Sequence, residues 1–335
     1  MTKQRETPPV HLVHGDAIDM GEHVRSESVD LAYLDPPFAV GITFRARAAR
    51  PLQSRANGRP LAPLGHEPSR ESGEIAYDDR WASLDAYIAW LEPRLDRVRS
   101  VLSPHGTLWL HLDQRAVHEA KVACDRVFGR AAFLGEVIWV PGNGSKKRRG
   151  PGMSHQTLLL YARGKDYVWN ARDPALRAPF ASTSLSMHFT RTDEQGRFFR
   201  ERTLGGKTYR YYADEGRALG SVWTDCPAMV ANTPLRKEST GYPTQKPRKL
   251  LDRIVRASSL EGSLVLDPFC GSGTTLHTAA ALGRRAVGFD TSQLAISTTR
   301  QRLADAKIPI SFTSRSGGAA LRESGGRNGQ GRRRG

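Results

Sequence analysis

The stretch Leu264-Val265-Leu266-Asp267-Pro268-Phe269-Cys270-Gly271-Ser272-Gly273-Thr274-Thr275 decides the fold class of this chain. It predicts an apolar strand that runs into Asp267, a glycine-containing turn, and a helix that begins at Thr274. Gly271 and Gly273 lack a Cβ atom, so they tolerate unusual dihedral angles and let the backbone approach a ligand. A strand that leads through such a turn into a helix is typical of the ligand-binding edge of a doubly wound α/β sheet.

Strands and helices alternate on both sides of this stretch. The apolar runs and helical spacings predict strands at 11–14, 29–34, 107–112, 136–140, 157–161, 263–266 and 286–289, and helices at 81–102, 115–128, 250–258, 274–282 and 292–303. This order predicts an α/β fold with a doubly wound, mostly parallel sheet.

Three segments break the alternation. Residues 41–76 are rich in Arg, Pro, Gly and Ser, so we expect a mobile loop there. Residues 170–240 are polar, aromatic and basic, which indicates an inserted module. Residues 313–335 form a Gly/Arg tail that we expect to be disordered. The remaining segments, 1–169 and 241–312, then make one discontinuous main domain.

The composition favours a nucleic-acid partner. Lys and Arg number 50 against 34 Asp and Glu, a formal charge of +16, and such an excess attracts polyanions. No stretch approaches the roughly 18 apolar residues of a membrane span, and the polar start is not a signal peptide, so we expect a cytoplasmic protein. The three cysteines lack CxxC spacing and the ten histidines lack an HExxH pattern, so neither a disulfide framework nor a metal site is expected.

Asp290 makes the glycine turn more informative. It ends the strand after the turn, where a doubly wound nucleotide site keeps the carboxylate that accepts hydrogen bonds from ribose hydroxyls. Leu276 occupies the position of the third glycine of a dinucleotide site, and no GxxxxGK[ST] phosphate loop is present. A nucleoside without a pyrophosphate, such as S-adenosylmethionine, therefore fits better than a dinucleotide or an NTP. A tight turn without any ligand is the alternative.

A second motif, Asp35-Pro36-Pro37-Phe38, also follows a predicted strand, because prolines end the run 29–34. It should therefore open onto the same edge of the sheet. The Asp35 carboxylate and the Pro36 carbonyl could accept the two N–H bonds of an exocyclic base amine, orienting its lone pair. Phe38 would offer a flat face to a base rotated out of a duplex. Taken alone, this tetrapeptide is more often a simple turn.

Together the two motifs resemble those of the amino-methylating DNA methyltransferases, whose marks are a D/N/S-P-P-Y/F/W tetrapeptide and an FxGxG loop. The catalytic motif precedes the cofactor motif here, as in the β class of that family. Further similar strings are His14–Ala17, Trp81–Asp113 and Tyr242–Pro247. The resemblance implies S-adenosyl-L-methionine as cofactor and double-stranded DNA as partner.

The resemblance also assigns roles to residues. The catalytic ones are Asp35, Pro36, Pro37 and Phe38, and the cofactor-binding ones are Asp16, Lys246, Asp267, Phe269, Gly271, Gly273, Thr274 and Asp290. Asp at the first position of the tetrapeptide favours adenine over cytosine within the family. Methylation of cytosine, of RNA or of a protein amide, and a catalytically inactive DNA-binding protein, are the alternatives.

DNA would be held by two regions. The module 170–240 would recognise the target sequence, because Arg side chains read guanine edges and neutralise phosphates while aromatic side chains stack or wedge. The basic run Lys146, Lys147, Arg148 and Arg149 would contact the phosphate backbone, with a plain charged surface loop as the alternative. A restriction endonuclease, a second copy of the chain and an association with the nucleoid are further expectations.

Overall fold

A nine-stranded sheet forms the centre of the protein. The computed structural model describes residues 9–46, 73–144, 147–229 and 237–314. The strand order across the sheet is β13 (Val222–Trp223), β6 (Phe133–Trp139), β7 (Gln156–Ala162), β5 (Leu102–Leu112), β2 (Val29–Leu34), β14 (Leu264–Asp267), β15 (Arg285–Asp290), β1 (Val10–His14) and β16 (Ile310–Ser314). All neighbours pair in parallel except β7, which is antiparallel to both β5 and β6. The prediction of a mostly parallel sheet is confirmed.

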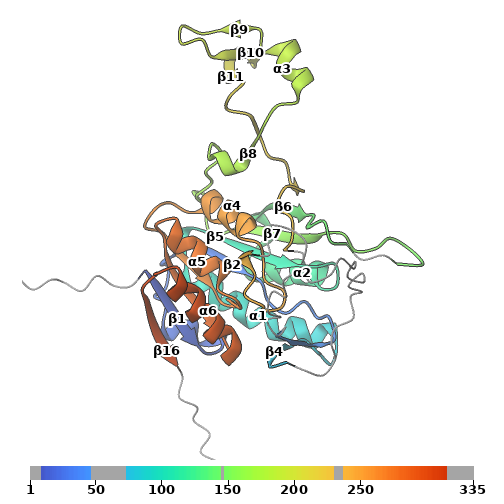
Figure 1. Cartoon of the computed structure of the whole chain (residues 1–335), viewed down its shortest axis with the longest axis vertical. Coiled ribbons are helices and arrows are strands. Elements are labelled where there is room, and N and C mark those ends of the chain that lie inside the picture. Colours follow the sequence, from blue (N-terminus) through green and yellow to red (C-terminus); the bar gives the residue numbers. More distant parts are fainter. Residues whose placement is uncertain (1–8, 47–72, 145–146, 230–236, 315–335) are drawn as a thin grey trace, which may run out of the picture.

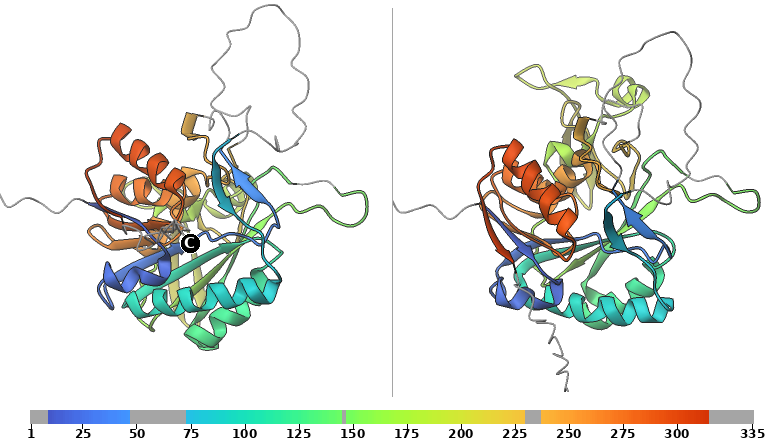
Figure 2. Two further views of the ribbon diagram at one scale, coloured as in Figure 1. Left: turned by 90° about the horizontal axis from the view of Figure 1, so that it is seen from below. Right: turned by 60° about the horizontal axis from the view of Figure 1, so that its bottom comes forward.

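Helices cover both faces of the sheet (Figure 2). One face carries α1 (Leu84–Val101), α2 (Val117–Phe128) and the 3₁₀ helix η1 (Ala17–Glu22), with a second 3₁₀ turn, η2 (Arg130–Ala132), after α2. The other face carries α4 (Arg248–Ser258), α5 (Thr274–Ala281) and α6 (Gln293–Asp305). Each layer closes its own buried apolar cluster against the sheet. The doubly wound architecture is therefore also confirmed.

The centre of the sheet is buried on both sides, and this explains its continuous apolar strands. Leu31 and Ala32 of β2 and Val265 and Leu266 of β14 have no exposed surface, as strands covered by helices on both faces require. From β14 the chain moves through α5 to β15 on one side, whereas from β2 it moves through α1 to β5 on the other. The winding direction thus reverses between β2 and β14, and such a point is where doubly wound sheets bind ligands.

Two strands differ from the sequence prediction. β5 begins at Leu102 rather than at residue 107, and it runs through Pro104. The pairing register of β2 with β5 shifts between Val29 and Leu31, and a strand accepts proline at such an irregularity because no ladder donor is required there. β16 was not predicted; it pairs with β1 and extends the main domain to Ser314, so the boundary placed at 313 is wrong. The rest of the predicted tail lies outside the described residues.

The two ends of the predicted loop 41–76 are ordered. β3 (Thr43–Arg45) and β4 (Ile75–Asp78) pair in antiparallel fashion, and the rings of Phe44 and Tyr77 stack with centroids 4.8 Å apart. The prediction of a loop without regular structure is therefore wrong at both ends. Residues 47–72 lie outside the described residues.

The segment predicted as an insertion contains small elements of its own. They are η3 (Pro174–Leu176), β8 (Arg177–Ala178), α3 (Ser182–His188), β9 (Arg191–Thr192), β10 (Phe198–Leu204), β11 (Lys207–Tyr212) and β12 (Arg217–Ala218). In Figure 1 the three-stranded sheet β9–β11 and α3 stand away from the main sheet, beyond β8. β13 lies within 170–240 yet pairs with β6 of the main sheet. The part that leaves the main sheet is therefore shorter than predicted.

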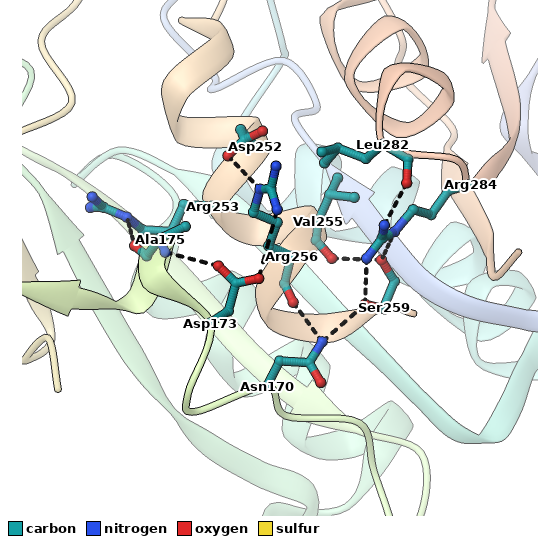
Figure 3. Close-up of polar contacts among 10 residues, drawn as sticks. All are labelled: Asn170, Asp173, Ala175, Asp252, Arg253, Val255, Arg256, Ser259, Leu282 and Arg284. Carbon is teal, nitrogen blue, oxygen red and sulfur yellow. Dashed lines mark hydrogen bonds and ion pairs between the residues drawn. The ribbon is translucent and has the colours of Figure 1, made fainter. Parts of the chain in front are cut away.

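Helix α4 holds the chain where it enters this segment (Figure 3). The Asn170 side-chain amide donates to the carbonyls of Arg256 and Ser259 at 2.7 and 3.0 Å, and Arg253 Nε donates to the carbonyl of Ala175 at 2.8 Å. The Arg256 guanidinium also lies 3.8 Å from the carboxylate of Asp173. These contacts fix the entering chain along one helix of the main domain.

The same helix holds the returning chain. Both terminal nitrogens of Arg253 donate hydrogen bonds to the carboxylate of Asp225, at 2.8 and 2.6 Å. The guanidinium of Arg253 also lies 4.9 Å from the ring centroid of Trp223. Arg253 and Lys249 together hold the pKa of the Asp225 carboxyl well below its usual range. One buried arginine therefore joins both ends of the segment to the main domain.

The three cysteines lie in the interior of the protein. Cys124, Cys226 and Cys270 are all buried free thiols. No helix within the described ranges is long and apolar enough to cross a membrane.

Candidate active site

Three adjacent strands deliver carboxylates to one edge of the sheet. Asp35 follows β2, Asp267 ends β14 and Asp290 ends β15. Burial raises the pKa of Asp267 to about 7 and that of Asp290 to about 6. An edge with so much buried acidity favours ligands that bring positive charge or hydrogen-bond donors.

Asp35 is bound by a lysine that is 211 residues away in the sequence. Lys246 Nζ donates to both carboxylate oxygens of Asp35 at 2.6 and 2.5 Å. Both side chains are largely buried, with exposed fractions of 8% for Lys246 and 17% for Asp35. Burial raises the pKa of Asp35, and the Lys246 ammonium opposes this rise. Lys246 was predicted near the cofactor; the structure places its ammonium on the carboxylate of Asp35.

The loop after Asp35 is wrapped around a second carboxylate, that of Asp79. The backbone N–H groups of Phe38, Ala39 and Val40 donate to its two oxygens at 3.1, 2.9 and 3.0 Å, and Trp81 Nε1 donates at 2.9 Å. Ala39 adopts a left-handed φ of +56°, a conformation that a non-glycine residue keeps only when its surroundings enforce it. Asp79 has no exposed surface. It holds the Phe38 loop in place.

The ring of Phe38 lies near the ammonium of Lys246 and the imidazole of His111. Lys246 Nζ is 4.9 Å from the centroid of the Phe38 ring, and the centroid of the His111 ring is 5.9 Å away. Tyr33 Oη and His111 Nδ1 are hydrogen-bonded at 2.8 Å. Burial holds the pKa of His111 well below its usual range.

The glycine turn is fixed at both of its glycines. The Gly271 N–H donates to Asp290 Oδ2 at 2.9 Å, and its carbonyl accepts from Thr299 Oγ1 at 2.9 Å. Gly273 caps α5 with a left-handed φ of +72°, and a Cβ atom there would lie 2.6 Å from Thr299 Oγ1. Conformation and space therefore both require glycine at 273. Hydrogen bonds thus join the turn, Asp290 and Thr299 into one unit.

Of the other predicted cofactor residues, Asp267 and Phe269 lie at the start of this turn. The Phe269 N–H donates to Asp267 Oδ1 at 3.1 Å, so Asp267 stabilises the turn. The Phe269 ring lies 5.6 Å from that of Trp90 in α1 and covers the apolar side of the site.

Asp16 and Thr274 already have protein partners. Arg94 donates to both carboxylate oxygens of Asp16 at 3.0 and 2.5 Å, and Asp16 also caps η1. The Thr274 hydroxyl accepts from Arg302 Nη1 at 2.5 Å. The backbone N–H of Thr274 lies in the first turn of α5, where N–H groups have no acceptor within the helix, so it can donate to a ligand.

The string Tyr242–Pro247 and strand β4 add two aromatic residues that the sequence prediction missed. A Cβ atom at Gly271 would lie 3.2 Å from Tyr242 Cε1, so Tyr242 covers the glycine turn. Tyr77 Oη is hydrogen-bonded to Thr244 Oγ1 at 3.2 Å. Burial raises the pKa of both phenols. Only the lysine of this string carried a charge that pointed to chemistry, so its tyrosine was overlooked.

The basic run is not part of this buried site. Lys147, Arg148 and Arg149 are exposed on the loop between β6 and β7, which extends outward in Figure 2, and Lys146 lies outside the described residues. β6 points in the same direction as β2, so this loop leaves the sheet at the edge where Asp35 lies.

A family model described as DNA methylase, of the N6/N4 group, matches residues 29–301. The chain belongs to this family. The match begins at the strand that carries Asp35 and includes the glycine turn and Asp290. The order of the two motifs makes this DNA methylase an amino-methyltransferase of the β class.

Curated relatives of this methylase cover most of its length. The Type II methyltransferase M.EcaI of Enterobacter cloacae is 28% identical over 86% of this chain and 67% of its own. The DNA adenine methyltransferase YhdJ of Escherichia coli K12 is 25% identical over 87% of this chain and 82% of its own.

Solved structures share the fold of this methylase. The DNA modification methylase TTHA0409 of Thermus thermophilus aligns with a TM-score of 0.50 at 18% identity, covering 90% of this chain and 98% of its own. The cytosine-N4-specific PvuII DNA methyltransferase aligns with a TM-score of 0.51 at 12% identity, covering 91% and 97%. At these identities the likeness concerns the fold.

Proposed function

We propose that this DNA methylase transfers the methyl group of S-adenosyl-L-methionine to the exocyclic amine of adenine in double-stranded DNA, at a specific sequence. The observation that carries the proposal is the pairing of Asp35 with Lys246 at the switch point of the sheet, beside the Gly271–Gly273 turn. Adenine is favoured by Asp at the first position of the tetrapeptide and by the activity named for YhdJ.

The residues of the cofactor edge fit S-adenosylmethionine. The glycine turn would lie at the amino-acid end of the cofactor, and Asp290, with two oxygens that each accept one backbone N–H, retains lone pairs for ribose hydroxyls. The acidic edge suits a cation. When bound, the cofactor supplies a methyl group activated by the positive charge on its sulfur.

Asp35 orients the amine that is to be methylated. A carboxylate offers about four lone-pair sites, and Lys246 takes up two through its bonds to the two oxygens. The remaining sites accept an N–H of the target amine, and the Pro36 carbonyl accepts the second. S-adenosylmethionine would supply the methyl group: the amine nitrogen would bond to the methyl carbon as the sulfur leaves as a neutral thioether, and the surplus amine proton would then pass to water. Positioning and electrostatics carry this step, with no prior deprotonation.

The partial burial of Asp35 and Phe38 supports base flipping as part of this proposal. Asp35 and the Phe38 ring lie within the edge of the sheet, where a stacked base cannot reach them. Phe38 gives the rotated base an apolar face, and the imidazole of His111 lies next to that ring. We include base flipping in the proposal for this reason.

The remaining parts of the chain receive roles in the same proposal. The discontinuous main domain binds the cofactor, the segment within 170–240 recognises the DNA sequence, and Lys147, Arg148 and Arg149 contact phosphates. A cognate restriction endonuclease and a homodimer are the partners that we propose, by analogy with the Type II enzyme M.EcaI for the first.

The test is mass spectrometry of nucleosides from unmethylated DNA treated with the purified protein and S-adenosylmethionine. N6-methyladenine in wild-type samples is the expected product. N4-methylcytosine would overturn the choice of base, and methylated RNA or protein alone would overturn the substrate class. No product with intact DNA binding would indicate an inactive DNA-binding protein.

The matched variant is Asp35→Ala. We expect it to lose methyl transfer by at least about 10³-fold, with cofactor affinity, measured by calorimetry, within roughly tenfold of wild type. Turnover retained in this variant would remove Asp35 from its role even if N6-methyladenine is the product.

A further inference from the structure

The outer part of the β10–β11 hairpin is a narrow two-stranded ribbon. β9 pairs only with Phe198 and Phe199, so the hairpin has no third strand beyond them. At the tip, Leu204 lies opposite Lys207, and Gly205 and Gly206 adopt left-handed φ values of +55° and +76°. Two such residues make the tight hairpin turn that suits the twist of the strands. A two-stranded ribbon fits the major groove of B-DNA, which is about 12 Å wide.

On one face of the ribbon, two arginines share one carboxylate. Glu201 accepts from Arg191 at 2.6 Å and from Arg210 at 2.9 Å, and both guanidinium groups lie over the ring of Phe199. Farther out on the same face, the hydroxyls of Thr203 and Thr208 are hydrogen-bonded to each other at 3.0 Å. This face is satisfied by its own residues.

The opposite face carries Arg202, Leu204, Lys207 and Tyr209, with Arg202 opposite Tyr209 and Leu204 opposite Lys207. Leu204 is 60% exposed and Tyr209 is 42% exposed. Within the described part of the chain, neither Arg202 nor Lys207 forms an ion pair. Lys207 Nζ instead lies 5.8 Å from the ring of Tyr209. The outer ribbon thus presents two cations and two apolar side chains together.

The inner end of this same face is covered. The guanidinium of Arg200 lies 5.3 Å from the ring of Phe180 and 5.0 Å from that of Phe189, which flank α3. Phe189 is only 4% exposed. The protein therefore covers the inner half of the face and leaves the outer half open. The exposed Leu204 and the two cations of the outer half are then available to a partner.

We propose that this open face, defined by Arg202, Leu204, Lys207 and Tyr209, binds double-stranded DNA, with the ribbon lying in the major groove. The inference rests on the proposed function, because it takes DNA as the substrate. The two cations complement phosphates and base acceptors, and the two apolar side chains suit thymine methyl groups and sugar edges. An acidic protein surface would also complement the two cations, but the fit between a two-stranded ribbon and the width of the major groove favours DNA.

The experiment compares wild type with the double variant Arg202→Ala/Lys207→Ala of the full chain. Methylation of unmethylated bacteriophage DNA with radiolabelled S-adenosylmethionine should show the KM for DNA raised at least about tenfold, with kcat within roughly twofold. Anisotropy with a labelled 30-base-pair duplex should show the slope of log K against log salt reduced by about 2, since each lost phosphate contact removes about one unit.

The control variants use the same hairpin. Thr203→Ala and Thr208→Ala, made together or singly, change only the opposite face, so each of these variants should keep KM and the salt slope within about twofold of wild type. An unchanged KM and salt slope in the alanine variant, or an equal loss in the threonine control, would overturn the inference. Wild-type protein that methylates no DNA would instead overturn the proposed function, so the two failures are distinct.

Discussion

The active-site edge and the projecting β9–β11 hairpin use the same side chains in opposite surroundings. At the edge, Lys246 and Asp35 form an ion pair whose members are 8% and 17% exposed. On the hairpin, Arg210 and Glu201 form one whose members are 46% and 25% exposed. The first pair has lost most of its water, so each charge depends on the other. The second pair remains in water and contributes little. The two regions therefore differ in how deeply their ion pairs are buried, more than in the type of contact.

The largest effect that follows from this comparison is expected at Asp79. Replacing Asp79 by Ala leaves three backbone N–H groups of the Phe38 loop and one indole N–H without their acceptor. We expect unfolding free energy to fall by about 3 kcal/mol and kcat to fall by roughly 10² or more because Phe38 is no longer held in place. Denaturant unfolding and steady-state assays measure both. Asp78→Ala, at an exposed neighbouring carboxylate, is the control, and equal losses in the two variants would contradict the assignment.

The next effect is expected at Lys246. Lys246→Met removes the cation that opposes the raised pKa of Asp35, so that pKa rises further. The acid limb of the pH profile of kcat should therefore move to higher pH, and activity on that limb should fall. Lys246→Arg should restore the limb in part. A uniform loss at every pH would show that Lys246 acts only on structure.

A smaller effect is expected from the titration of Asp290. Its pKa of about 6 means that it is ionised at pH 8 but mostly protonated at pH 5. The ionised form is the better acceptor for ribose hydroxyls, so the affinity for S-adenosylmethionine should weaken about tenfold from pH 8 to pH 5. Calorimetry at several pH values measures this, and Asp290→Asn should flatten the profile. An unchanged slope in that variant would assign the dependence to another group, with Asp267 as the next one to test.

The same raised pKa values have a consequence for stability without ligand. Asp267 and Asp290 bind protons more tightly in the folded protein than in the unfolded chain. Their titration therefore lowers the free energy of unfolding as pH rises from about 4 to about 7. Ligand donors at these carboxylates would offset this loss.

The smallest effect is expected on the hairpin. Glu201→Gln removes the carboxylate shared by Arg191 and Arg210, which is an exposed cluster. The thermal midpoint should stay within roughly 2 °C of wild type. A larger drop in a thermal melt would show that the hairpin depends on its charges for folding, and the contrast with the active-site edge would then be wrong.

Much of the fold and of the site could be predicted because it depends on local sequence. The strand ends at Asp35, Asp267 and Asp290 and the glycine turn were located from short apolar runs and from the residues that stop them. The start of β5 was missed because Pro104 suggested a break, whereas the irregular pairing with β2 accepts it. β16 was missed because five residues without a following helix give little signal.

The sequence by itself determined which residues could take part in the chemistry and where each strand would end, because strand and turn formation depend on neighbouring residues. Only the tertiary structure placed Lys246 on Asp35, across 211 residues, and folded the Phe38 loop around Asp79, across 41. Among the residues that the structure describes, it also gives Arg202 and Lys207 no ion pair on one face of the hairpin, whereas Arg191 and Arg210 share Glu201 on the other. Partners and burial come from packing between distant segments, and burial decides how strongly each charge acts.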